Sequence, residues 1–328
     1  MNIKKAIAVL TLVLFLASCF FGCAKISGQS SKNSRVAIII KGSDSDFWKD
    51  VKNGAFSAAT EYNIDITFEG PDNEEDYESQ NKMIENAVSK KVGAIILSAI
   101  DYEKNAPAVQ KAVNSGIKVI TVDSDVDVSG KELFIGTNNF SAGEKAAEQA
   151  IKLCKNRDSI NIGIVNYGAN TENGKQRIQG FTDYVANAEN AQIVGTVNIE
   201  SNTESAIAGA KQLLGENESI DVLVGFNEWS TLGVGYAIKE LGLKDSVCGI
   251  GFDSNVNCVS MLETGELDSL IVQNPFSMGY LSVSKAAEIL DGKKSDSVIE
   301  TDTYAVTREN MFSQDVQKIL FSFNDGEE

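Results

Sequence analysis

Short apolar runs rich in β-branched residues alternate with longer amphipathic stretches through almost the whole chain. The runs that we expect to be strands are residues 35–41, 64–70, 92–98, 117–123, 159–165, 191–199, 220–226, 247–253 and 267–273. Several of them are apolar at successive positions, which is typical of parallel strands that are covered on both faces. The stretches between them, such as 48–62 and 74–91, carry apolar residues at helical spacing. The pattern therefore predicts an α/β fold built from doubly wound parallel sheets.

Nine strands are more than one open sheet holds comfortably, so we expect two Rossmann-like lobes joined by hinge crossovers. No linker rich in Pro and Gly separates the halves, which indicates that the chain crosses between the lobes through strands or short hinges. Pro275 suits the start of a helix at such a crossing. The expected lobes are residues 35–137 with 274–302, and residues 138–273 with 303–328.

The first residues are typical of a secretory signal sequence. Lys4 and Lys5 precede an apolar run over residues 6–17, which is too short to span a bilayer. We therefore interpret residues 1–18 as a signal peptide that is removed from the mature protein.

The apolar run ends at Leu16-Ala17-Ser18-Cys19, which resembles the bacterial lipobox. The resemblance implies cleavage before Cys19 and a lipid on its thiol, and thus a protein anchored to the outer face of the cell membrane. The alternative is a secretory signal without lipidation. Residues 24–34 are polar and rich in Ser, and we expect residues 19–34 to form a flexible, lipid-anchored tether.

Composition excludes several classes of function. The chain contains no His, so a Ser-His-Asp triad, a Cys-His pair and a His-ligated zinc site are all ruled out. The formal net charge is −17, which argues against a nucleic-acid partner, because phosphate binding needs a basic face. An enzyme would have to work with carboxylates, Lys, Tyr or a bound metal.

Three cysteines remain in the predicted folded body, Cys154, Cys248 and Cys258. Three cysteines in a chain of this size do not make a disulfide framework. We interpret them as buried thiols, with a Cys248–Cys258 bridge as the alternative.

Polar side chains follow several of the predicted strands at the point where each strand ends. In open parallel sheets, ligands bind beyond these carboxyl ends. The candidates are Asp123, Asn227, Asp253 and Gln273 directly after strands, Arg177 near the start of the helix after 159–165, Asn139 after a short strand at 133–136, and the aromatic pair Phe47 and Trp48 at a helix start.

This set of side chains suits a neutral polyol. Carboxylates accept hydroxyl donors, amides both donate and accept, and Arg offers a fork of donors, while aromatic faces pack on the C–H face of a sugar. Each residue also has a structural interpretation: Asp123 and Asp253 as helix N-caps, Phe47 and Trp48 as packing residues, and Arg177 as a surface residue. A calcium loop beginning at Asp123 is a weaker alternative, because the position that needs Gly is Val128.

At these residues the chain resembles the bacterial periplasmic sugar-binding proteins of the ribose-binding type, the solute receptors of ABC transporters. The resemblance covers about residues 35–310. It is carried by DFWKDVKNGA at 46–55, KVITVDSD at 118–125, FIGTNNFSAGEKAA at 134–147, Arg177 to Phe181, VGFNE at 224–228 and GIGFDS at 249–254.

The resemblance implies a fold of the type called periplasmic binding protein-like I, whose two lobes close on a pentose or hexose. Phe47 and Trp48 would stack on the sugar, and Asp123, Arg177, Asn227, Asp253 and Gln273 would bind its hydroxyls, with Asn139 close by. The chain departs from the ribose receptor at Ser45 and Ser124, where that receptor has Asn and Arg. The aromatic of its second lobe is also replaced, by Ser201 or a neighbour.

Three functions follow from this resemblance as hypotheses. The first is a monomeric receptor that delivers a sugar to an ABC transporter permease, without a cofactor or metal. The second is a sensory receptor for a membrane histidine kinase or chemoreceptor, and the third is an extracytoplasmic carbohydrate enzyme using Asp123 and Asp253. The N-terminal signal sequence argues against a DNA-binding repressor.

Overall fold

A computed structural model describes residues 35–42, 45–168 and 170–321, which belong to one compact unit. The predicted signal peptide, Cys19 and the tether lie outside the described residues. Within the described ranges, no helix combines the length and the apolar character needed to cross a membrane.

The first sheet has six strands in the order β11-β5-β4-β3-β1-β2, and every pair in it is parallel. Its strands are β1 (Arg35–Ile39), β2 (Asp65–Glu69), β3 (Ala94–Leu97), β4 (Lys118–Val122), β5 (Leu133–Thr137) and β11 (Val298–Thr301). Its helices are α2 (Asp46–Tyr62), α3 (Tyr77–Ser89), α4 (Ala106–Asn114) and α10 (Pro275–Leu290). We call these elements the first lobe.

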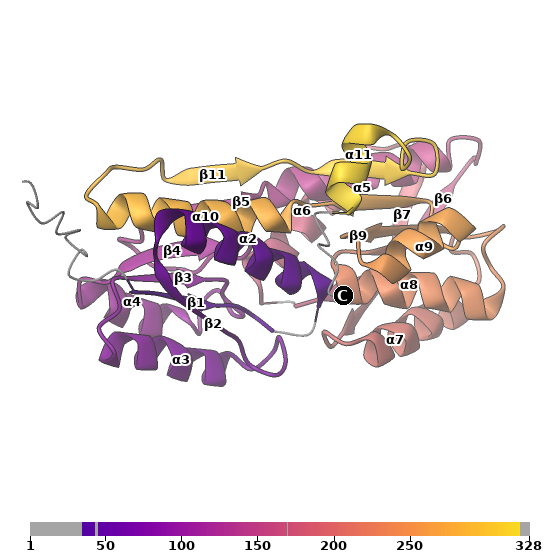
Figure 1. Ribbon diagram of the computed structural model, residues 1–328. Coiled ribbons are helices and arrows are strands. Elements are labelled where there is room, and N and C mark those ends of the chain that lie inside the picture. The colour runs from indigo at the N-terminus through magenta and orange to yellow at the C-terminus, as the bar shows by residue number, and fades with distance from the viewer. Residues whose placement is uncertain (1–34, 43–44, 169, 322–328) are drawn as a thin grey trace, which may run out of the picture. The chain divides into compact units, whose positions relative to one another are not determined.

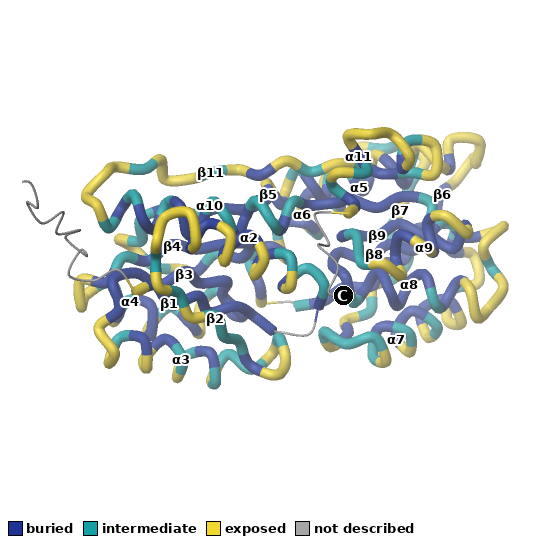
Figure 2. Tube along the Cα trace, in the orientation of Figure 1, coloured by how far each residue is buried: buried dark blue, intermediate teal, exposed yellow. Residues whose placement is uncertain are grey.

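Both faces of the first sheet are covered, as the continuous apolar runs predict. Ile38 of β1 packs in a core with residues of α2 and α10, whereas the next residue, Ile39, packs in a separate core with residues of α3 and α4. Successive side chains of a strand point to opposite faces, so a strand buried on both sides has to be apolar throughout. Figure 2 shows β1, β3 and β4 in the buried colour.

The second sheet also has six strands, in the order β12-β10-β9-β8-β6-β7, with β12 antiparallel to β10. Its strands are β6 (Ile160–Tyr167), β7 (Ala191–Ile199), β8 (Val222–Gly225), β9 (Cys248–Phe252), β10 (Ser269–Val272) and β12 (Tyr304–Thr307). Its helices are α5 (Asn139–Leu153), α6 (Glu172–Ala186), α7 (Thr203–Glu216), α8 (Glu228–Leu241), α9 (Val256–Thr264) and α11 (Gln314–Leu320). We call these elements the second lobe (Figure 1).

The chain passes between the lobes at three short crossovers. They lie between β5 and α5 at residues 137–139, between β10 and α10 at 272–275, and between β11 and β12 at 301–304. Pro275 is the first residue of α10, where a missing N–H and a fixed φ favour the start of a helix. Short crossovers of this kind are where a hinge motion can be absorbed.

The α/β fold with two parallel-sheet lobes is confirmed, and each of the nine predicted runs contains a strand. The sequence analysis missed β11 and β12, which are four residues each and pair at sheet edges. Both have mixed polar and apolar residues, because an edge strand is not covered on two faces.

Both lobes contain helices whose backbones touch at glycines. A Cβ on Gly54 of α2 would lie 2.0 Å from the Phe276 carbonyl oxygen, and one on Gly279 of α10 would lie 1.9 Å from that of Val51. In the second lobe the same contact joins Gly143 of α5 to α6, where a Cβ would lie 2.0 Å from the Arg177 carbonyl oxygen. Only glycine allows helices to pack this closely.

We predict that Gly279→Ala destabilises the protein by about 1–3 kcal/mol, because the added methyl group has to push α2 and α10 apart. The matched control is Gly215→Ala, at an exposed position of α7 where a Cβ has no neighbour within 4 Å. That substitution should stabilise the helix by roughly 0.5–1 kcal/mol. Urea denaturation of both variants measures the contrast, and equal free energies of unfolding would contradict the close packing.

Candidate functional site

A cavity between the two lobes collects most of the predicted binding residues. Seven of the eight predicted residues line it: Phe47, Trp48, Asp123, Arg177, Asn227, Asp253 and Gln273. Its volume is about 30 Å³, which is space for roughly two water molecules. In this state the cavity is therefore filled almost completely by its own side chains.

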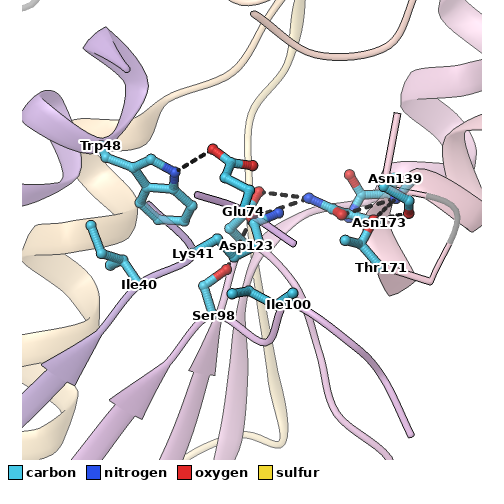
Figure 3. Close-up of polar contacts among 12 residues, drawn as sticks. Ile40, Lys41, Trp48, Glu74, Ser98, Ile100, Asp123, Asn139, Thr171 and Asn173 are labelled. Atoms are coloured by element: carbon cyan, nitrogen blue, oxygen red, sulfur yellow. Dashed lines mark hydrogen bonds and ion pairs between the residues drawn. The ribbon is translucent and has the colours of Figure 1, made fainter. Parts of the chain in front are cut away.

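Asp123 is the centre of the first-lobe side of the site. It follows β4 and is buried, and its carboxylate lies 2.9 Å from the Lys41 ammonium group. Ser98 Oγ donates to it at 3.1 Å, and Asn173 Nδ2 of α6 in the second lobe donates to both of its oxygens at 3.0 and 3.1 Å. Figure 3 shows Asp123 and Lys41 facing Asn173 across the site. Asp123 thus connects the two lobes.

Lys41 lies two residues after the end of β1 and is buried. Burial lowers the pKa of Lys41, but the negative charges of Asp123 and Glu74 and the Tyr167 hydroxyl outweigh that effect and raise it. Lys41 is therefore a permanently charged donor in the cavity. The sequence analysis missed it, although it follows a strand in the same way as the predicted residues.

Arg177 is the centre of the second-lobe side. The guanidinium is 1% exposed, so the interpretation as a surface residue is wrong. Its Nε donates to Asn139 Oδ1 at 2.8 Å, its Nη1 to the Phe226 carbonyl at 2.8 Å and its Nη2 to Gln273 Oε1 at 2.7 Å. The guanidinium also lies over the Phe252 ring, 4.7 Å from its centroid. Asn139 does not line the cavity but holds the Arg177 side chain.

Gln273 links Arg177 to Asp253. Its Oε1 also accepts from Thr137 Oγ1 at 2.8 Å, and its Nε2 donates to Asp253 Oδ1 at 2.7 Å. Burial raises the pKa of Asp253, while Arg177 and the Gln273 hydrogen bond act in the opposite direction. The second-lobe wall of the cavity thus carries a donor, an amide and an acceptor in series: Arg177, Gln273 and Asp253.

Asp123 and Asp253 occupy matching places in the two lobes. Both have a left-handed backbone, with φ of 60° and 71°, and neither is the N-cap of a helix. The backbone N–H of Asp123 donates to Ile135, and that of Asp253 donates to Ile271, each at 3.0 Å. Strained backbone at both sites is consistent with a functional role, because it holds each carboxylate toward the cavity.

Four aromatic side chains line the cavity: Phe47, Trp48, Tyr167 and Trp229. Phe47 and Trp48 at the start of α2 pack edge to face, with ring centroids 5.0 Å apart. Trp229 at the start of α8 adds a ring from the second lobe. Both indoles donate to Glu74 Oε1, Trp48 at 3.1 Å and Trp229 at 3.5 Å. We did not expect Trp229 from the sequence. Ser201, which the resemblance places at or next to the position of a second-lobe aromatic, is not among the residues that line this cavity.

Asn227 lines the cavity but also caps α8. Its Oδ1 accepts from the Ser230 backbone N–H at 2.9 Å and from the Ser230 hydroxyl at 2.7 Å. The carboxylate of the next residue, Glu228, accepts from the backbone N–H groups of Asp46 and Phe47 at 3.3 and 3.1 Å. Glu228 of the second lobe thus binds the N-terminus of α2 in the first lobe, where negative charge is favoured.

Asp125 does not take part in a calcium loop. It accepts a hydrogen bond from Thr121 Oγ1 at 2.7 Å, and it forms an ion pair with Lys131 at 2.8 Å. Across the described part of the chain, no group of three or more Cys, Asp or Glu side chains could hold a metal ion.

Comparisons with known proteins agree on one family. A sequence model of the family described as periplasmic binding protein domain matches residues 36–294. The D-ribose/D-allose-binding protein of Pseudomonas aeruginosa is 25% identical over 307 residues, which is 90% of this chain and 95% of that protein.

Two solved structures are also similar. A carbohydrate transporter solute-binding protein from Agrobacterium radiobacter, in complex with D-arabinose, has a TM-score of 0.85 and 27% identity, over 89% of this chain and 100% of that one. An ABC transporter solute-binding protein from Agrobacterium vitis, with bound D-fucose, has a TM-score of 0.84 and 32% identity, over 87% and 99%.

We predict that stability falls as the pH rises from about 4.5 to about 7 because of Glu228. Burial raises its pKa from 4.5 to about 7 in the folded chain, so in this range the folded state binds a proton that the unfolded state has lost. The loss reaches about 3 kcal/mol for this group at pH above 7. The Tm measured by calorimetry should fall between pH 5 and 8, and it should fall less in Glu228→Gln than in the wild-type protein. The decline should not vanish, because the pKa values of Glu74 and Asp253 are raised as well. Identical slopes would contradict this role of Glu228.

Proposed function

This chain belongs to the periplasmic binding protein family, and we propose on that premise that it is an extracytoplasmic receptor for a sugar in ABC transport. In this proposal the two lobes capture a monosaccharide or a similar polyol and deliver it to a transporter permease. Members of the family that it resembles are binding components of transporters, so the protein is not an enzyme. The hypothesis of a carbohydrate enzyme is therefore set aside.

The observation that carries the proposal is the two-sided polar cavity with aromatic walls. Its carboxylates Asp123 and Asp253 come from different lobes, and donors from Lys41 and Arg177 lie beside them. A sugar has hydroxyl groups around its ring and apolar C–H faces, so it needs both kinds of partner at once. A preformed set of this kind supports binding of such a ligand.

We propose separate roles for the site residues. Asp123 and Asp253 would each accept hydrogen bonds from sugar hydroxyls, and Arg177 and Gln273 would donate to ring or hydroxyl oxygens. The rings of Phe47, Trp48 and Trp229 would pack on the C–H faces. Asn227, with its Oδ1 used in the cap of α8, would have its Nδ2 for the ligand. Asn139 would act by holding Arg177.

Binding would require opening at the crossovers, because about 30 Å³ is far less than a monosaccharide occupies. In the open state the ligand would replace contacts that the site now makes with itself, such as Lys41 with Asp123. Closure would then follow from the higher affinity of the ligand for the closed state.

The strand orders of the two sheets support lobes at 35–137 with 274–302 and 138–273 with 303–328. Since one chain supplies both walls, we propose that it works as a monomer.

We predict that Asp253→Ala weakens sugar binding by roughly 100-fold or more. A carboxylate that holds ligand hydroxyls in a closed site makes charge-assisted hydrogen bonds of about 1.5–3 kcal/mol each. The control is Asp127→Ala, because Asp127 is exposed. The neighbouring Asp125 is less suitable as a control, because it forms an ion pair with Lys131. A thermal-shift screen of D-ribose, D-allose, D-arabinose, D-fucose, D-fructose and D-xylose identifies the ligand, and calorimetry then compares the variants. Absence of binding to every sugar would contradict the proposed function, and equal affinities would contradict the role of Asp253.

We also propose that the chain is attached to the membrane through a lipid on Cys19. The support is the lipobox-like sequence Leu16-Ala17-Ser18-Cys19 after the apolar run. Mass spectrometry of the membrane-extracted protein should find a mature chain that begins at a diacylglyceryl-modified Cys19. Cys19→Ser should abolish the modification. A mature wild-type chain that begins elsewhere, and is free in the medium, would contradict the anchor.

A further inference from the structure

Two thiols that are 94 positions apart in the sequence lie in contact in the second lobe. The Sγ atoms of Cys154 and Cys248 are 3.6 Å apart. We propose that these two residues are the site of a disulfide that forms when the protein meets an oxidising disulfide reagent. The bond requires the sulfur atoms to approach to about 2.05 Å, which is a shift of roughly 1.5 Å and within the reach of small side-chain rotations.

The backbone around both cysteines is fixed by contacts that bring their segments together. Cys154 is the C-cap of α5 and Cys248 is the first residue of β9. Arg157 links the two segments, because its Nη2 donates to the Ser246 carbonyl at 2.8 Å and its backbone N–H donates to the Cys154 carbonyl at 2.9 Å. Arg157 also forms an ion pair with Asp221, whose carbonyl accepts from the Cys248 N–H at 2.9 Å. The approach of the thiols is therefore built into the fold.

The pKa values of the two thiols shift in opposite directions, because the hydrogen bond with Cys154 and burial raise the pKa of Cys248. The hydrogen bond with the Cys248 thiol lowers the pKa of Cys154 against the opposing effect of burial, and the positive charge of Arg157 lowers it further. Cys248 is half-buried whereas Cys154 is 3% exposed. The reagent therefore reaches Cys248 first, and Cys154 is placed to resolve the mixed disulfide.

The reaction balances with oxidised glutathione as the oxidant. The Cys248 sulfur, after losing its proton to solvent, attacks one glutathione sulfur and releases the other as a thiolate. The Cys154 thiolate then attacks the Cys248 sulfur and releases the second glutathione thiolate. Two protein thiols are oxidised to one disulfide, and one oxidised glutathione is reduced to two thiols, which take up the two protons. An extracytoplasmic location, which is part of the proposed function, would allow such a bond to persist.

The cross-link would stabilise the second lobe without touching the cavity. Each cysteine lies at the end of its element that is farther from the site. The helix α5 begins at Asn139 and is capped at its other end by Cys154, whereas β9 begins at Cys248 and ends at Phe252, directly before Asp253. The alternative bridge to Cys258 has no support, since Cys258 is buried in α9 and the contact of Cys248 is with Cys154.

The test is to equilibrate the full chain with oxidised glutathione, block free thiols and digest with trypsin and then chymotrypsin. Cleavage after Phe252 separates Cys248 from Cys258, so mass spectrometry should identify one peptide that links Cys154 to Cys248. The oxidised protein should melt roughly 5–10 °C above the reduced protein, because the bond closes a long loop in the unfolded chain. Cys248→Ser should lose this difference, and Cys258→Ala should keep it.

Recovery of Cys154 and Cys248 as blocked free thiols, or a link from either to another cysteine, would overturn the proposal. So would an oxidised wild-type protein whose Tm equals that of the reduced protein. The readouts do not involve a ligand, so they are independent of the sugar-binding test. A change in sugar affinity on oxidation would contradict the placement of the bond away from the cavity.

Discussion

The candidate site depends on the hydrogen bonds of the buried Arg177 guanidinium. It is satisfied by Asn139, Gln273 and the Phe226 carbonyl, and a buried charge is tolerated only when it is paired and hydrogen-bonded in this way. Asn139 and Gln273 lie at two of the three crossovers between the lobes. The same residue therefore holds the second-lobe wall of the site and the segments at which the lobes can bend. Any movement of the crossovers changes the partners of Arg177, which couples closure to the shape of the site.

The polar groups of the site are largely satisfied by one another. Lys41 pairs with Asp123, Asn173 binds the same carboxylate, and Gln273 binds Asp253. A ligand gains affinity only by replacing these contacts with equally good ones, since an unsatisfied buried partner costs about 1–3 kcal/mol. Under the proposed function, specificity would follow from this arrangement. A polyol whose hydroxyls match the donors and acceptors would restore every hydrogen bond, and one that lacks a hydroxyl would leave a group unsatisfied.

The local sequence pattern was sufficient to predict the parallel strands and the polar residues that follow their carboxyl ends. Asp123, Asp253 and Gln273 could be found because parallel strands end at one edge of a sheet, so residues that follow them converge without further information. Trp229 and Glu74 could not be found in this way, since one begins a helix and the other lies in a loop, and only the packing of the lobes brings them together. The same limit applies to the contact of Cys154 with Cys248, which depends on the order of the strands in the second sheet.

The close contact between α2 and α10 has a consequence for the order in which the two lobes fold during synthesis. The first lobe begins at β1, but one face of its sheet is covered by α10 and one edge is completed by β11. Its apolar core on that face thus stays open until residues 275–301 have been synthesised. The second lobe is almost complete by Val272, so the C-terminal half can fold earlier than the N-terminal half, contrary to the usual order along a chain.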